Sequence, residues 1–225
     1  MNSSTLSAQS DEIDVARRLP SVDRRQQILE VAIRLFAEHG FSGTRTRAVA
    51  EAAGVNEALL FRYFAGKEDL YAAILEYKAT LARTDCWVDE LRDAARADGD
   101  RGVVTRLVAL LVHHQQQDPA FLRLMLHSAL ECHKFAGEFR NRHYAPLYNF
   151  LLEYVQAAQA AGRFRRADPH ALVRFMLAVP SYHALLETVL PMQRMADETP
   201  TASYTDLILG GVTSPSSDSP QDVHA

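Results

Sequence analysis

Residues 44–64 read TRTRAVAEAAGVNEALLFRYF, and this stretch decides the fold that we expect. It contains two short helical segments that meet at Gly54, with Ala50 four residues before the glycine and Leu60 six residues after it. A helix-turn-helix needs these residue types at this spacing. The small residue lets the second helix cross closely, the glycine permits the turn, and the aliphatic side chain fills the space between the helices. The three-residue pattern alone also arises by chance in helical proteins. The assignment of a helix-turn-helix therefore depends on the sequence on either side of it.

Apolar residues on both sides of this motif recur at helical spacing, without a convincing run of the alternation that indicates a strand. A helix is expected from about Asp23 to His39, because its apolar side chains share one stripe and Gly40 closes it. A fourth helix should follow Gly66 and reach the low 80s. The acidic stretch 89–100 is expected to be a break. Further helices are expected at about 102–117, 119–135, 140–161, 168–189 and 200–212, which makes the protein all-α.

The composition of the 225 residues, 48% hydrophobic and 23% charged, is ordinary for a globular protein. Neither a signal peptide nor an apolar run of roughly 20 residues is visible, so we expect a cytoplasmic protein without a membrane partner. The net charge of −4 hides an asymmetry, because residues 17–70 hold nine basic and seven acidic residues. A locally basic segment on an acidic chain is a weak hint of an anionic partner.

Patterns of catalysis and metal binding are missing from the sequence. The adjacent His113 and His114 would point about 100° apart on a helix, so they cannot chelate one metal as a pair. There is no His-Glu-x-x-His motif, no glycine-rich phosphate loop and no Gly-x-Ser-x-Gly elbow. We therefore expect neither an enzyme nor a metal site or cofactor.

A longer stretch around the motif, RRQQILEVAIRLFAEHGFSGTRTRAVAEAAGVNEALLFRYFAGKEDL, strongly resembles the N-terminal domain of the tetracycline-repressor (TetR) family. The matching features include Gly40-Phe41, Gly43-Thr44, Ala53-Gly54-Val55 and Lys67-Glu68-Asp69-Leu70. The resemblance implies a three-helix helix-turn-helix DNA-binding domain, whose third helix enters the major groove, followed by a helical ligand-binding and dimerisation domain. The expected division is a disordered tail over 1–20, the DNA-binding domain over 21–82 with its motif over 45–64, the second domain over 83–212, and a disordered tail over 213–225.

The residues of the motif are compatible with a DNA contact. Thr44 or Thr46 can cap the second helix, whose free N–H groups suit a phosphate, and Asn56 carries an amide suited to an adenine edge. Basic side chains on either side can reach backbone oxygens. The candidate DNA-binding residues are Thr44, Arg45, Thr46, Arg47, Asn56, Glu57, Ala58, Phe61, Arg62, Tyr63 and Lys67.

Two positions depart from the family's pattern. Glu57-Ala58 stands where the family often has Lys-Gly. The Glu57 carboxylate either accepts a hydrogen bond from a cytosine amino group or stabilises the helix start from the solvent side. Phe61 replaces the family's usual tyrosine, which removes a hydroxyl that could contact a phosphate. These departures concern the sequence preference of the protein and not its binding to DNA.

The second domain combines wide apolar faces with interleaved polar groups. Ordinary packing explains each residue singly, whereas together they suit a mostly apolar cavity for a small hydrophobic effector with a polar end. The candidate pocket residues are Leu107, Leu111, Gln117, Met125, His127, Glu131, Tyr144, Tyr148, Tyr182 and His183. By resemblance, the last two helices pair with their copies in a homodimer, through Leu172, Phe175, Met176, Val179, Leu186, Tyr204, Leu207, Ile208 and Gly211.

The sequence therefore predicts a homodimeric repressor that a small ligand releases from its operator. Because one helix-turn-helix reads only a short half-site, the operator should be an inverted repeat of double-stranded DNA. Two alternatives stay open within DNA binding: a regulator without an effector, and an activator. The alternative from another class is an all-helical enzyme or lipid-binding protein in which the motif is incidental.

Overall fold

The structure, a computed structural model, describes residues 21–131, 137, 139–188 and 200–214. Its elements within these ranges are helical, apart from one isolated bridge between Phe164 and Thr213, so the expected all-α class is confirmed. The two expected tails lie outside the described residues except at 213–214. There the backbone pairs with the segment after α9, because Ser214 N–H donates to the carbonyl of Arg163 at 2.9 Å.

The chain divides into two compact units, residues 1–74 and 75–225. Helix α5 (Lys67–Ala82) runs through this division, so one helix belongs to both units. The domain boundary expected from the sequence, after residue 82, falls at the end of the same helix. Each unit is described by itself below.

The first unit consists of α2 (Ser21–Gly43), α3 (Thr46–Ala52), α4 (Glu57–Tyr63) and the beginning of α5. Helix α2 breaks at the expected glycine, since Gly40 has a φ of 72°. The chain then brings Phe41 back against α5, where the rings of Phe36 and Phe41 lie 5.2 and 5.3 Å from the ring of Tyr71. These buried rings join α2 to α5 and close the core of the unit.

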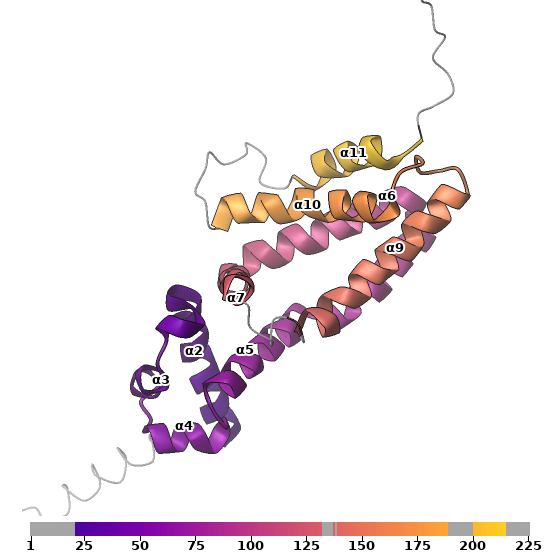
Figure 1. The fold of residues 1–225 in the computed structure, drawn as a ribbon. Helices are drawn as coiled ribbons and strands as arrows, with labels where there is room; N and C mark the ends of the chain where they lie inside the picture. Colours follow the sequence, from indigo (N-terminus) through magenta and orange to yellow (C-terminus); the bar gives the residue numbers. More distant parts are fainter. Residues whose placement is uncertain (1–20, 132–136, 138, 189–199, 215–225) are drawn as a thin grey trace, which may run out of the picture. The chain divides into compact units, whose positions relative to one another are not determined.

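The second unit contains η1 (Thr84–Cys86), α6 (Trp87–Gln117), α7 (Pro119–Leu130), the π-helical turn η2 (Arg140–Tyr144), α9 (Ala145–Ala160), α10 (Pro169–Thr188) and α11 (Thr201–Val212). Figure 1 shows α10 and α11 side by side along α6, and α9 packs against both α6 and α10. Fully buried side chains such as Leu107, Leu151, Met176 and Ile208 form the core between these helices. No helix in the described part of the chain is long and apolar enough to cross a membrane.

The expected break over 89–100 is confined to two residues, because the rest of this acidic stretch is helical within α6. Its first acids, Asp89 and Glu90, lie in the first helical turn, where the positive end of the helix favours negative charge. Leu91 is fully buried, so the stretch also contributes to the core. Non-helical backbone is confined to Asp98 and Gly99, the latter with a φ of 55°.

This kink generates a prediction about Gly102. A Cβ atom at Gly102 would lie 2.3 Å from the carbonyl oxygen of Ala94, whereas a Cβ atom at Gly210 in α11 would meet nothing within 4 Å. We expect Gly102→Ala to lower the free energy of unfolding by about 1–3 kcal/mol through overpacking. The control Gly210→Ala should raise it by roughly 0.5–1 kcal/mol, because alanine loses less backbone entropy in a helix. Urea denaturation measures both, and equal effects would contradict the packing described at the kink.

Candidate nucleic-acid interface

The turn between α3 and α4 has the geometry that its sequence requires. Gly54 adopts a φ of 65°, a conformation that glycine reaches without a steric penalty. The N–H of Val55 donates to the carbonyl of Ala50 at 2.9 Å, which closes the end of α3. Ala50 and Leu60 are both buried, so the small and the aliphatic positions of the motif pack as expected.

Helix α4 is seven residues long and begins at a capped residue. The Oδ1 atom of Asn56 accepts a hydrogen bond from the N–H of Leu59 at 2.7 Å. The same oxygen would be needed to read adenine with both amide atoms, since an amide accepts from N6 while it donates to N7. Because an amide oxygen has two lone pairs, Oδ1 of Asn56 would have to accept from Leu59 and from adenine at once, and the adenine contact stays a prediction.

The start of α3 differs from expectation, because neither threonine caps the helix. Its N-cap residue is Arg45, which makes no side-chain capping bond. Thr44 is buried, and its hydroxyl donates to the carbonyl of Gly40 at 2.8 Å. Thr46 donates its hydroxyl to the carboxylate of Glu57 at 2.6 Å. The sequence pattern missed these partners because both lie in other elements of the unit.

The bond between Thr46 and Glu57 also explains the acidic residue at the start of α4. The half-buried carboxylate joins the first turn of α3 to the first turn of α4. Glu57 lies in the first turn of α4, as the alternative of a helix-stabilising acid requires, and the cytosine contact stays a prediction. On α3, Arg47 donates to Glu51 at 2.8 Å, and this hydrogen bond raises the pKa of Arg47, so its guanidinium stays charged.

Most of the candidate residues gather around one hollow of about 470 Å³ on the surface of this unit. Phe61 faces it with 46% of its surface exposed, although it is a large apolar side chain. Three basic residues and one acid give the hollow a positive balance. The hollow is lined by Thr44, Arg45, Thr46, Arg47, Glu57, Phe61 and Lys67.

The remaining candidates lie on α4 itself or at its cap. Ala58 and Arg62 are exposed, and Tyr63 is half-buried with its ring 6.0 Å from the guanidinium of Arg62. The ammonium of Lys67 lies 4.5 Å from the ring centre of Phe41, which positions the first turn of α5 beside the hollow. The helix-turn-helix thus buries its inner side in the first unit and exposes an outer side whose hollow has a positive balance.

Comparison with known proteins agrees with this geometry. The family described as "Bacterial regulatory proteins, tetR family" matches residues 28–74. The HTH-type transcriptional repressor AcnR of Corynebacterium diphtheriae is 32% identical over 170 residues, which are 74% of this chain and 77% of that protein. The chain belongs to the TetR family.

Other relatives and solved structures support the same assignment. The HTH-type transcriptional regulator AcrR of Shigella flexneri is 32% identical over 116 residues, 52% of each protein. The ketosteroid transcriptional regulator KstR2 of Mycobacterium tuberculosis superposes with a TM-score of 0.62 at 20% identity, over 88% of this chain and 98% of that chain, which shows the shared fold. This TetR-family chain is a DNA-binding transcriptional regulator and not an enzyme.

The second unit of this TetR-family chain contains a cavity of about 470 Å³ that the sequence located only in part. Gln117 lines this cavity, and Met125 and Tyr144 line a smaller one of about 40 Å³. The sequence missed most of the lining, because adjacent histidines and isolated basic residues carry no periodic signal. The lining of the larger cavity is Lys78, Leu81, Ala82, Arg83, Trp87, Leu110, His113, His114, Gln117 and Asp118.

The structure places the other predicted pocket residues elsewhere. Leu107 and Leu111 are buried in the core, and Tyr182 is 58% exposed. The remaining polar candidates have partners of their own: His127 lies 4.0 Å from Glu131, Tyr148 bonds His170 at 2.9 Å, and His183 bonds Tyr204 at 3.1 Å. Within the described residues, no group of three metal-ligating side chains could hold a metal ion.

The predicted dimer stripe divides into two faces. Leu172, Met176 and Ile208 are buried in the chain's own core, so assigning them to a surface between two copies is wrong. Phe175 and Leu207 are 40% and 65% exposed. The other predicted members, Val179, Leu186, Tyr204 and Gly211, are half-buried. Helical spacing identified the apolar positions but could not separate the two faces.

The cap at Asn56 gives a direct test of how α4 is held. We expect Asn56→Ala to lower the free energy of unfolding by about 1 kcal/mol, because the N–H of Leu59 loses its acceptor. Asn56→Ser should restore most of this loss, since serine caps helices about as well as asparagine. Thermal denaturation compares the three proteins. If Asn56→Ser were as unstable as Asn56→Ala, the capping role would be contradicted.

Proposed function

We propose that this TetR-family protein is a homodimeric repressor that binds an inverted-repeat operator and is released from it by a small molecule. The observation that carries the proposal is the exposed basic hollow formed by α3, α4 and the start of α5. The residues that line this hollow include Glu57 and Phe61 of α4, and Leu60 on the opposite side of α4 is fully buried. The AcnR relatives of C. diphtheriae and C. glutamicum are both described as HTH-type transcriptional repressors, which supports repression as the activity.

In this proposal α4 enters the major groove. Phe61 is exposed beside the hollow, and an apolar side chain there suits the methyl group of thymine. The cationic side chains of Arg45, Arg47, Arg62 and Lys67 neutralise phosphates on either side. The carboxylate of Glu57 is held by Thr46, so its charge is kept within the motif.

The homodimer is proposed on the exposed face of α10 and α11. Phe175 and Leu207 are large apolar side chains that water would otherwise surround. Two copies joined by such a face would present two reading helices, which a palindromic operator requires. The small-molecule effector is proposed to occupy the larger cavity of the second unit, whose lining mixes apolar and polar groups.

The experiment that tests this proposal is selection of bound sequences from random duplex DNA by the full-length protein. Enrichment of an inverted repeat is expected. Recovery of unrelated sequences at one affinity would contradict sequence-specific regulation, and a single non-repeated half-site would contradict the dimer.

The role of Arg62 can be measured on the selected operator. We expect Arg62→Ala to weaken binding about equally for all sequences and to reduce the slope of log affinity against log salt by roughly one unit. Arg96→Ala is the matched control, because Arg96 is also exposed but lies on α6 in the second unit. An unchanged slope for Arg62→Ala would exclude a phosphate contact at this residue.

The proposed dimer face predicts different outcomes for two neighbouring residues of α11. Leu207→Asp should dissociate the dimer and leave the fold intact, since Leu207 is 65% exposed in one chain. Ile208→Asp should unfold the chain instead, because its side chain is fully buried and an unpaired charge there is strongly unfavourable. Light scattering gives the mass and circular dichroism the helix content. Leu130→Asp, an exposed leucine on α7, serves as the control and should leave the mass unchanged.

A further inference from the structure

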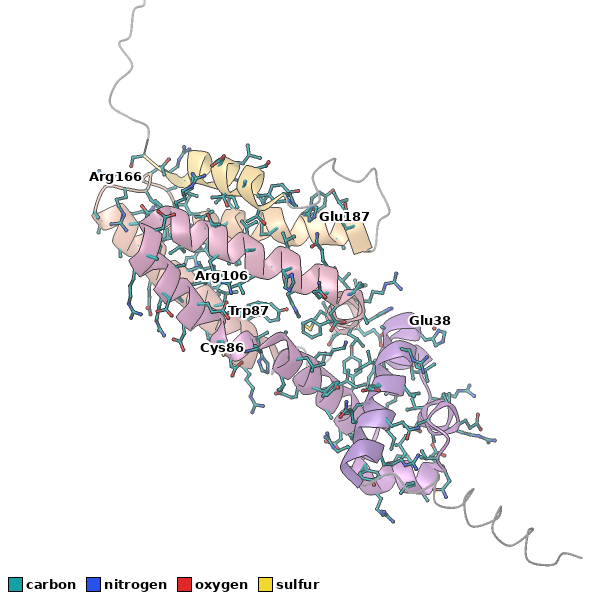
Figure 2. All side chains as sticks on the ribbon, turned by 180° about the vertical axis from the view of Figure 1, so that it is seen from behind. Glu38, Cys86, Trp87, Arg106, Arg166 and Glu187 are labelled. Carbon is teal, nitrogen blue, oxygen red and sulfur yellow. The ribbon has the colours of Figure 1, made fainter. Side chains whose placement is uncertain are left out.

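We propose that the larger cavity of the second unit binds a carboxylate with a short apolar body, and that the carboxylate pairs with Lys78. This inference rests on the proposed function for its regulatory consequence, because it names the chemical class of the proposed effector. The cavity lies where the last turns of α5 meet both ends of α6. Trp87, labelled in Figure 2, marks its position at the start of α6.

The polar lining of the cavity offers mainly hydrogen-bond donors. Lys78 and Arg83 are cationic, and His113 and Gln117 add further N–H groups. The ring atom Nε2 of His114 is buried without a hydrogen-bond partner among the described residues. Burial lowers the pKa of His114, so the neutral ring, with one N–H, predominates at pH 7. Lys78 and Arg83 already have partners, Asp118 and the thiol of Cys86, so the unpartnered group is Nε2 of His114. An incoming oxygen acceptor would give this nitrogen a partner when it carries the ring proton.

Asp118, the acid in this lining, is already committed. Its Oδ1 accepts from the N–H of Phe121 at 3.1 Å and caps α7, while its Oδ2 lies 2.6 Å from the ammonium of Lys78. A cationic ligand would therefore meet Lys78 and Arg83 without a carboxylate available to neutralise it. The charge of the site favours an anion.

The apolar lining explains why the anion should carry a hydrophobic body. Trp87 is buried, and its indole N–H donates to the carbonyl of Ala82 at 3.2 Å. The polar atom of the indole is thus satisfied, and the rest of the ring offers apolar surface. Leu81 is 60% exposed and lines the same cavity with Leu110, so a hydrocarbon group would cover surface that water now contacts.

Binding at Lys78 would act on the ion pair that joins α5 to the junction of α6 and α7. The side chains of Lys78 and Asp118 are only 13% and 19% exposed, so this pair is poorly screened by solvent. A ligand carboxylate competes with Asp118 for the same ammonium. Helix α5 continues without interruption from Lys78 back to Lys67, which lines the hollow of the first unit. The ligand therefore changes the restraint on a helix that carries part of the proposed DNA surface.

The chain provides its own reporter, because Trp87 is the only tryptophan in the sequence. We would titrate the full-length protein with 3-phenylpropionate, 3-phenylpropanol and 3-phenylpropylamine, and follow tryptophan fluorescence at wavelengths where the probes do not absorb. The three probes share one skeleton and differ in charge. The acid should bind about tenfold more tightly than the alcohol, as expected for a hydrogen bond to a charged group, and the amine should bind most weakly.

A charge-neutral double variant tests the role of the ion pair. Lys78→Gln combined with Asp118→Asn removes both charges while it keeps the size of the side chains. We expect this variant to lose most of its preference for the acid over the alcohol, because the carboxylate no longer finds the ammonium of Lys78, while Arg83 keeps a smaller part of the preference. Arg92→Gln with Asp89→Asn removes an exposed ion pair of α6 outside the cavity and should leave all three affinities unchanged. Should the Lys78 variant fail to fold, the comparison of probes on the unmodified protein decides the question.

Three results would overturn the proposal: an alcohol that binds as tightly as the acid, an amine that binds more tightly than the acid, or no response of Trp87 fluorescence to the acid at millimolar concentration.

Titration of the selected operator separates this inference from the proposed function. If the acid binds and operator affinity falls, both are supported. If the acid binds and operator affinity stays unchanged, the ligand class stands and the proposed release is wrong. If only uncharged compounds release the operator, release stands and the ligand class is wrong.

Discussion

Helix α4 is seven residues long, and a helix of this length is not stable in water by itself. Its existence depends on anchors at each stage of the motif. The left-handed backbone at Gly54 reverses the chain, Asn56 caps the first turn, and Leu60 is fully buried beneath the helix. Because Leu60 holds the inner side of α4, the outer side is left for exposed residues such as Phe61 and Arg62. The DNA surface that we propose depends on this arrangement.

The bond between Thr46 and Glu57 adds a second restraint, which acts on the relative position of α3 and α4. This polar bond lies at the edge of the hollow and joins the starts of the two helices, while Val49, Ala50 and Leu60 pack in the core. The acid is then neither a defect in a basic surface nor a free group. Its charge is partly satisfied within the motif, and the positive end of α4 favours it further.

Sequence reasoning succeeded where one periodic pattern determined the outcome. Ala50, Gly54 and Leu60 occupy the predicted positions because turn geometry and close packing tolerate few other residues there. It failed where a residue's partner is distant in the chain. Thr46 looked like a cap but bonds Glu57 eleven positions later. The acids of 89–100 looked like one long break, although only Asp98 and Gly99 leave the helix and Leu91 is buried in the core. The cavity was missed for a related reason, since Lys78 and Asp118 meet only after α5 and α6 have packed.

The central claim is that α4 reads the major groove of an inverted repeat. Methylation protection with dimethyl sulfate on the selected operator tests it most directly, because this reagent attacks guanine N7 in the major groove and adenine N3 in the minor groove. We expect protection of guanine N7 in two symmetric clusters about one helical turn apart, roughly 10 base pairs. Protection of adenine N3 alone, or of one cluster without its symmetric counterpart, would contradict it.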